Sequence, residues 1–121
     1  MSTPALSELA SVLQNPTAAL DSRFRCLFAL KGLASASPEQ TKEVIDIIAK
    51  AFENNDSALL KHELAYVLGQ IQSEEAIGCL EDVLKDEEEH PMVRHEVCCL
   101  SKLPCSCLWL TFVCFSIMKG C

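Results

Sequence analysis

The stretch Ala58-Leu-Leu-Lys-His-Glu-Leu-Ala-Tyr-Val-Leu-Gly-Gln-Ile71 decides the predicted fold. At about 100° of rotation per helical residue, four of its apolar residues lie within about 80° of Leu60 and form one stripe. These residues are Leu64, Val67, Leu68 and Ile71. His62 then lies on the opposite side of the helix, and Glu63 lies at the margin of the stripe. The stretch therefore predicts an amphipathic helix whose polar face carries a His-Glu pair.

The frame around this pair recurs along the chain. Lys61-His-Glu-Leu64 is followed 33 residues later by Arg94-His-Glu-Val97, and Arg25-Cys-Leu-Phe28 precedes it by 36 residues. A helix pair repeated at such a period is typical of an α-solenoid, in which each pair buries its apolar face on its neighbours. The sequence therefore predicts an all-α solenoid of about three helix pairs. The two His-Glu pairs should stand side by side on neighbouring, parallel second helices.

Helical spacing of apolar residues extends the prediction to the rest of the repeat segment. Further helices are expected over residues 4–13, 18–34, 38–52, 74–85 and 92–103. The third of them has a start signal, with Ser37 as N-cap, Pro38 at the first helical position and Gln40 at the capping-box position. No alternating apolar pattern bounded by turns predicts a strand.

The charge balance narrows the range of partners. The chain has 17 acidic and 10 basic residues and a net charge of −7. It offers no stripe of Lys and Arg side chains that could neutralise a phosphate backbone, so nucleic acid is not expected as a partner. An acidic surface suits a cationic partner instead. The run Glu87-Glu-Glu89 is a candidate for attracting such a partner, although a charged run in a loop is usually only solvated.

Cysteine usage and the N-terminus indicate the compartment. Cys26 and Cys79 each lie inside an apolar helical pattern, which predicts two small buried thiols and no disulfide framework. No basic segment followed by an apolar stretch opens the chain, so no signal peptide is expected. We therefore expect a reducing, cytoplasmic location.

Residues 98–121 differ in character from the preceding part. They hold six of the eight cysteines and only two charged residues, Lys102 and Lys119. The uncharged run 105–118 is shorter than the roughly 20 residues of a membrane span, so no membrane association is expected. The cysteines do not form two CxxC knuckles, which argues against structural zinc.

Repeat periodicity also ends in this region, because Pro104 replaces the stripe residue Ile71 one repeat later. We therefore divide the chain into a helical-repeat segment, residues 1–97, and a divergent Cys-rich apolar tail, residues 98–121, of irregular or short-helical structure. The abrupt loss of register suggests a truncated or alternatively spliced product, or a gene model that reads into non-coding sequence.

The motifs are specific enough to resemble a known family. Asp56-Ser-Ala-Leu-Leu-Lys-His-Glu-Leu-Ala-Tyr-Val-Leu-Gly-Gln70 and Pro91-Met-Val-Arg-His-Glu96 closely resemble deoxyhypusine hydroxylase, a monooxygenase. Arg23-Phe-Arg-Cys-Leu-Phe-Ala-Leu-Lys-Gly-Leu33 resembles that family's first repeat. The resemblance covers about residues 5–97. It implies HEAT-like repeats in two pseudo-symmetric halves whose four His-Glu motifs surround a di-iron centre.

The resemblance also implies an activity and a ligand set. The family uses molecular oxygen to hydroxylate the deoxyhypusine side chain of a translation initiation factor in hypusine biosynthesis, and that factor would be the partner. By position, the metal ligands of the N-terminal half correspond to His62, Glu63, His95 and Glu96. This chain then carries two of four motifs, would be inactive alone, and would need the missing C-terminal half to complete the site.

The chemistry of the His and Glu side chains agrees with an iron site. Imidazole nitrogen and carboxylate oxygen together suit a transition metal of intermediate hardness, above all Fe(II). A solvated helix face carrying ordinary surface residues is the alternative for the His-Glu pairs. A non-catalytic helical-repeat module that binds another protein is the alternative function. Phycobilin-type helical-repeat lyases share the repeat but do not account for the recurrence of His-Glu.

Overall fold

The computed structural model describes residues 3–53, 57–71 and 73–100, and the side chains of residues 6–53, 57–71 and 73–97. This part of the chain forms six α-helices and two short 3-10 helices and contains no strand. The α-helices are α1 (Thr3–Leu13), α2 (Leu20–Ala36), α3 (Thr41–Glu53), α4 (Ala58–Ile71), α5 (Ile77–Lys85) and α6 (Pro91–Leu100). Pro38–Gln40 and Glu74–Ala76 form the 3-10 helices η1 and η2, which lead into α3 and α5. The predicted all-α class is confirmed.

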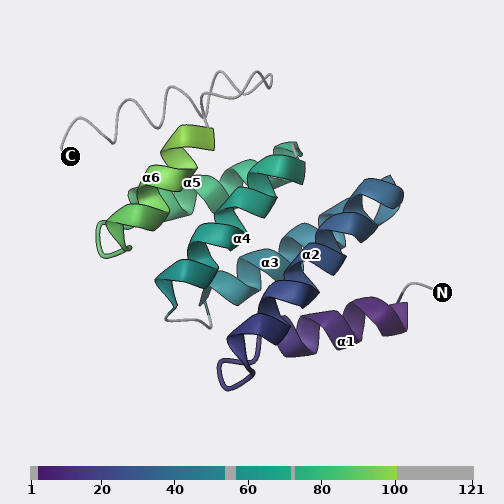
Figure 1. Ribbon diagram of the computed structural model, residues 1–121. Helices are drawn as coiled ribbons and strands as arrows, with labels where there is room; N and C mark the ends of the chain where they lie inside the picture. Colours follow the sequence, from purple (N-terminus) through teal and green to yellow (C-terminus); the bar gives the residue numbers. More distant parts are fainter. Residues whose placement is uncertain (1–2, 54–56, 72, 101–121) are drawn as a thin grey trace.

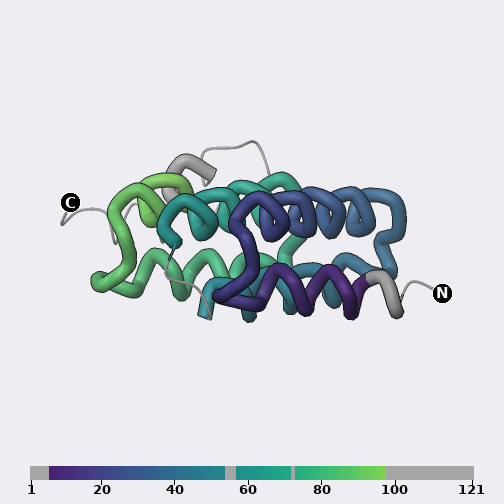
Figure 2. Tube along the Cα trace, turned by 60° about the horizontal axis from the view of Figure 1, so that its bottom comes forward, coloured from purple at the N-terminus to yellow at the C-terminus, as the bar shows by residue number. Residues whose placement is uncertain are grey.

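The six helices form two layers (Figures 1 and 2). Helices α2, α4 and α6 make one row, and α1, α3 and α5 make the other. Contacts join α1 to α2, α3 to α4 and α5 to α6 within each pair, and join α2 to α4 and α4 to α6 along the row. Figure 1 shows α2, α4 and α6 running in the same direction. Equivalent positions of α4 and α6 therefore lie side by side.

The core lies between the two layers and is formed by the apolar stripes of all six helices. Leu60, Leu64 and Val67 of α4 are fully buried, and so are Val93 and Val97 of α6. Burial of these stripes removes apolar surface from water, which is the main favourable contribution to folding. The stripe expected around Leu60 is thus the face that packs.

The first repeat is in a different register from the one that sequence matching predicts. Leu27 and Leu30 of α2 are fully buried, whereas Phe28 is 47% exposed. Burial therefore aligns Leu27 with Leu64 at a spacing of 37 residues. The spacing of 36 is wrong because it would place the exposed Phe28 at the buried position.

Two local expectations also need correction. Ser37 precedes η1 and Pro38 occupies the start of that helix, but the Ser37 side chain makes no capping hydrogen bond. Capping by serine occurs elsewhere: Ser57 Oγ accepts from the Leu60 amide at 3.2 Å. Cys26 and Cys79 are free thiols, as expected, but each is only partly buried at the edge of the core.

The predicted tail lies outside the described residues, apart from its first three at the end of α6. No helix in residues 3–53, 57–71 and 73–100 combines the length and the apolar character that a bilayer crossing requires.

In the first and third pairs, an arginine ties the two helices together, and of the two arginines Arg23 is buried and Arg94 is partly buried. Arg23 Nε donates to the Leu13 carbonyl at 3.1 Å, and Arg94 Nη2 donates to the Leu84 carbonyl at 3.2 Å. Both arginines lie ten residues after their acceptor, so each second helix is tied to the C-terminal end of its own first helix. The position 33 residues before Arg94 is Lys61, whose side chain instead reaches forward to the third pair.

Candidate functional site

The His-Glu motifs of α4 and α6 meet across the row of second helices. His62 lies one turn into α4, and its Nε2 is 3.0 Å from Oε2 of Glu96 on α6. Both side chains are partly exposed, so they lie at the surface of the helix row. The helical period turns His62 away from the core stripe of α4 and places Glu96 at the margin of the stripe of α6. Two motifs separated by one repeat thus share one contact.

The other two candidate ligands lie beside this contact. Glu63 Oε1 is 3.7 Å from His62 Nδ1, which is beyond ordinary hydrogen-bond length. His95 precedes Glu96 on α6 and is exposed. The structure therefore brings His62 and Glu96 into contact and places Glu63 within reach of the same imidazole.

The donor chemistry fits iron, but these residues do not make a complete coordination shell. Imidazole nitrogen and carboxylate oxygen are both represented at the His62–Glu96 contact. Within the part of the chain that the structure describes, no three His, Cys, Asp or Glu side chains are grouped so as to hold a metal ion. In this arrangement, the candidate ligands contact one another two at a time.

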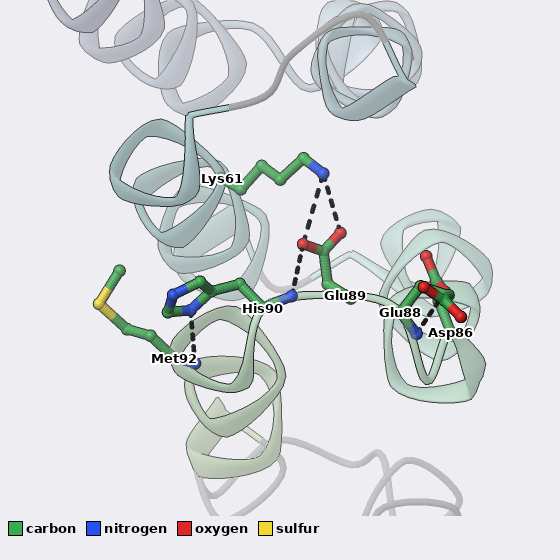
Figure 3. Close-up of polar contacts among 6 residues, drawn as sticks. All are labelled: Lys61, Asp86, Glu88, Glu89, His90 and Met92. Carbon is green, nitrogen blue, oxygen red and sulfur yellow. Dashed lines mark hydrogen bonds and ion pairs between the residues drawn. The ribbon is translucent and has the colours of Figure 1, made fainter.

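The loop before α6 contacts Lys61 of α4, the residue that precedes His62 (Figure 3). Glu89 of the α5–α6 loop accepts from Lys61 Nζ through both carboxylate oxygens, at 3.3 and 3.1 Å. Its Oε1 also accepts from the His90 amide at 2.9 Å. The His90 ring then caps the helix, because its Nδ1 accepts from the Met92 amide at 3.1 Å. Lys61 is adjacent to His62, so the contacts connect both helices of the site.

This arrangement bears on the expectation that the acidic loop attracts a cationic partner. The Glu89 side chain is only 9% exposed and pairs with Lys61, so it is not available to a cationic partner. Glu87 and Glu88 are exposed. His90 is exposed and is the N-cap of α6. The dipeptide His90-Pro91 carried that signal, because proline favours the first helical position.

An acidic cleft of about 530 Å3 lies beside the loop, between α3 and α5. Its lining has an apolar part from Ile45, Ala49, Phe52 and Val83, and carboxylates from Asp46, Glu53, Glu75, Asp82, Asp86 and Glu89. Burial, together with Asp82 and Glu53, raises the pKa of the Cys79 thiol in this cleft to about 11. That thiol is therefore protonated at neutral pH and is a poor nucleophile.

Comparisons with known proteins agree with the motifs. The chain is 48% identical over 96 residues to a deoxyhypusine hydroxylase of Drosophila pseudoobscura pseudoobscura, which covers 79% of this chain and 30% of that protein. It is 49% identical over 88 residues to the human deoxyhypusine hydroxylase, and the match covers 73% of this chain and 27% of the human protein. The deoxyhypusine hydroxylase of Saccharomyces cerevisiae is 45% identical over 96 residues, and the match covers 75% of this chain and 30% of the yeast protein. No family model matches the chain.

A solved structure extends the likeness to the fold. The chain superposes on human deoxyhypusine hydroxylase in complex with glycerol with a TM-score of 0.73 and 35% sequence identity, covering 97% of this chain and 42% of that one. The chain spans about 30% of the length of the curated relatives that it matches. By sequence and by fold, the chain is similar to part of a deoxyhypusine hydroxylase.

Proposed function

We propose that this chain supplies part of an iron-dependent monooxygenase that hydroxylates the deoxyhypusine side chain of a translation initiation factor. The observation that carries the proposal is the 3.0 Å contact between His62 Nε2 and Glu96 Oε2. It joins the two recurring motifs at one surface, in a chain similar to deoxyhypusine hydroxylases. A cytoplasmic location belongs to the same proposal.

The proposed ligands are His62, Glu63, His95 and Glu96. Bound Fe(II) would supply the activation of molecular oxygen, which protein side chains do not provide. The residues themselves present two imidazoles and two carboxylates from adjacent helices, and the carboxylates give the surface the negative charge that holds a divalent cation. They are two of the four His-Glu motifs that the resemblance implies.

The isolated chain is proposed to bind iron weakly and to lack turnover. Support comes from the absence of a three-ligand group in the described residues and from the share of its relatives that the chain spans. The remaining part of such a relative would supply further ligands. A cationic substrate side chain would be drawn to the site by the excess of acidic residues.

Metal titration tests the ligand assignment. Anaerobic addition of Fe(II) to the purified chain should give weak uptake that His62→Ala and His95→Ala each abolish. His90→Asn is the matched control, because asparagine is also a good N-cap and the third histidine is not among the proposed ligands. A stable two-iron centre in the monomer, or uptake that survives both alanine variants, would contradict the assignment.

Complementation tests the activity. The chain would be co-expressed with the remaining segment of the human relative and with a deoxyhypusine-bearing initiation factor, and the factor analysed by mass spectrometry. The mixture is expected to add one oxygen atom to the modified lysine, whereas the chain alone should add none. Addition by the chain alone, or none by the mixture despite association of the two segments, would contradict the proposal.

A non-catalytic binding module is the second candidate function. It is favoured by exposed apolar side chains on the second helices, where Leu59, Tyr66 and Met92 flank the His-Glu residues. Under this alternative, His62→Ala and His95→Ala leave partner binding intact and there is no metal uptake to lose. The titration above therefore separates the two functions.

A further inference from the structure

The α4–α6 contact of the site depends on where α6 begins. Glu96 lies on the second turn of α6, so a shift of that helix along its axis would move the carboxylate away from His62. One helical residue corresponds to a rise of about 1.5 Å, which is enough to break a contact of hydrogen-bond length. The start of α6 therefore has to be fixed relative to α4.

A second contact, besides that of His62 with Glu96, joins α4 to the region where α6 begins. Within the described residues, Lys61 of α4 and Glu89 of the α5–α6 loop form an ion pair at 3.1 Å. The Glu89 side chain is almost wholly buried, and that of Lys61 is largely so. A shielded pair is screened less by solvent than an exposed one, and losing one partner leaves a buried charge without compensation.

The ion pair is connected to α6 by a continuous series of hydrogen bonds. Glu89 accepts from the His90 amide, and the His90 ring accepts from the Met92 amide. The His90 carbonyl accepts from the Val93 and Arg94 amides at 3.0 and 3.1 Å, which forms the first turn of α6. Figure 3 shows Lys61, Glu89, His90 and Met92 in this order. A position fixed at Lys61 is thus transmitted to the first turn of α6.

We propose that Lys61 and Glu89 are positioning residues that set the axial register of α6 against α4, so that Glu96 meets His62. The relevance of this register to iron rests on the proposed function, but the register itself does not. Lys61 precedes His62 in α4, and Glu89 precedes the His90 cap of α6. The ion pair therefore fixes the two helices next to the residues whose contact it controls.

The test reads the His62–Glu96 contact directly, without metal. Long-range proton–nitrogen NMR spectra of the 15N-labelled chain report the Nε2 environment of His62, and Glu96→Ala gives the reference for a lost contact. In Lys61→Met, the His62 Nε2 signal is expected to move most of the way to that reference. Lys61→Arg keeps the charge and is expected to keep the wild-type signal.

Two measurements keep the test decisive if Lys61→Met does not fold. Glu89→Gln retains most of the shape, and it should also shift the His62 signal. Exchange of the Met92 and Val93 amides should accelerate by about tenfold in Glu89→Gln, since loss of the ion pair frees the first turn of α6. Glu81→Gln is the matched control, because it removes the Glu81–Lys85 ion pair within α5 and should change neither readout.

The outcomes separate this inference from the proposed function. Folded Lys61→Met and Glu89→Gln chains with unchanged His62 signals and unchanged amide exchange would overturn the positioning role. Cobalt(II), used as a spectroscopic probe, should bind the wild-type chain about tenfold more tightly than Lys61→Met, because a displaced Glu96 carboxylate is a poorer ligand. Failure of cobalt(II) to bind the wild-type chain would count against the metal assignment, while the NMR result would still decide the register.

Discussion

Glu96 Oε2 lies 3.0 Å from Nε2 of His62, although the two residues belong to different repeats of the chain. The contact exists because α4 and α6 run side by side in the same direction, so that a motif duplicated along the sequence is placed next to its copy. Repeat duplication thus doubles the His-Glu pair and also juxtaposes the two copies. This is a direct route from a sequence period to a chemical site.

The His62–Glu96 contact should be measurable as a coupling energy. In a double-mutant cycle of His62→Ala and Glu96→Ala, the free energies of unfolding should be non-additive by about 1 kcal/mol, because each single variant already removes the shared contact. Urea unfolding measures all four states of the cycle. Glu63→Ala is the control partner, since its carboxylate is 3.7 Å from the imidazole and should couple less. Additive effects for Glu96 would contradict the contact.

Burial predicts a sharp contrast between two leucines of α4. Leu64 is fully buried, so Leu64→Ala should lower the free energy of unfolding by about 2–5 kcal/mol through lost apolar contact and a residual cavity. Leu59 is 52% exposed, so Leu59→Ala should change the free energy of unfolding by less than about 0.5 kcal/mol. Thermal or urea unfolding followed by circular dichroism compares them. Equal costs would mean that the α4 stripe is not the packing face.

Two arginines of α2 offer a second matched pair. Arg23 is 4% exposed and donates to the Leu13 carbonyl, so Arg23→Ala should cost about 2 kcal/mol by removing packed side-chain atoms and leaving that carbonyl without its donor. Arg25 is exposed and pairs with Asp21 at the surface, so Arg25→Ala should be nearly neutral. Urea unfolding of both variants measures the difference. A larger loss for Arg25 would rule out the tie between α1 and α2.

Cys79 should be slow to alkylate at neutral pH. Burial and the neighbouring carboxylates of Asp82 and Glu53 raise the pKa of its thiol to about 11, and only the thiolate is nucleophilic. Its rate with iodoacetamide should therefore rise about tenfold per pH unit and level off only near pH 11, provided that the fold persists. Peptide mass spectrometry resolves it from the other cysteines. Cys26 is the internal comparison; a plateau for Cys79 below pH 9 would contradict the assignment.

Residues facing the core were the easiest part to predict from sequence. A stripe at the helical period fixes which side of α4 packs, so the burial of Leu60, Leu64 and Val67 follows from the spacing alone. The first repeat was misaligned by one residue because matching Arg25 to Lys61 uses a surface position. Buried Leu27 gives the correct register, since packing constrains core positions more tightly than exposed ones.

The sequence predicts that the His-Glu residues share a surface, but it does not predict the contacts that position them. The His-Glu recurrence indicated which side chains share a surface, because a repeat spacing specifies equivalent positions on neighbouring helices. The Lys61–Glu89 ion pair could not be found in this way, since its partners are 28 residues apart and one lies in a loop. Only the fold determines which residue of an acidic run meets a given lysine.

The ties between helices differ in kind along the stack. Arg23 and Arg94 each fasten a second helix to the first helix of its own pair through a backbone carbonyl, whereas Lys61 and Glu89 join the second pair to the third through charge. The joint between the second and third pairs therefore depends on an ion pair as well as on apolar packing. Because this ion pair is largely shielded, added salt should weaken it less than it weakens an exposed pair such as Arg25–Asp21, so the joint should keep its geometry over a wide range of ionic strength.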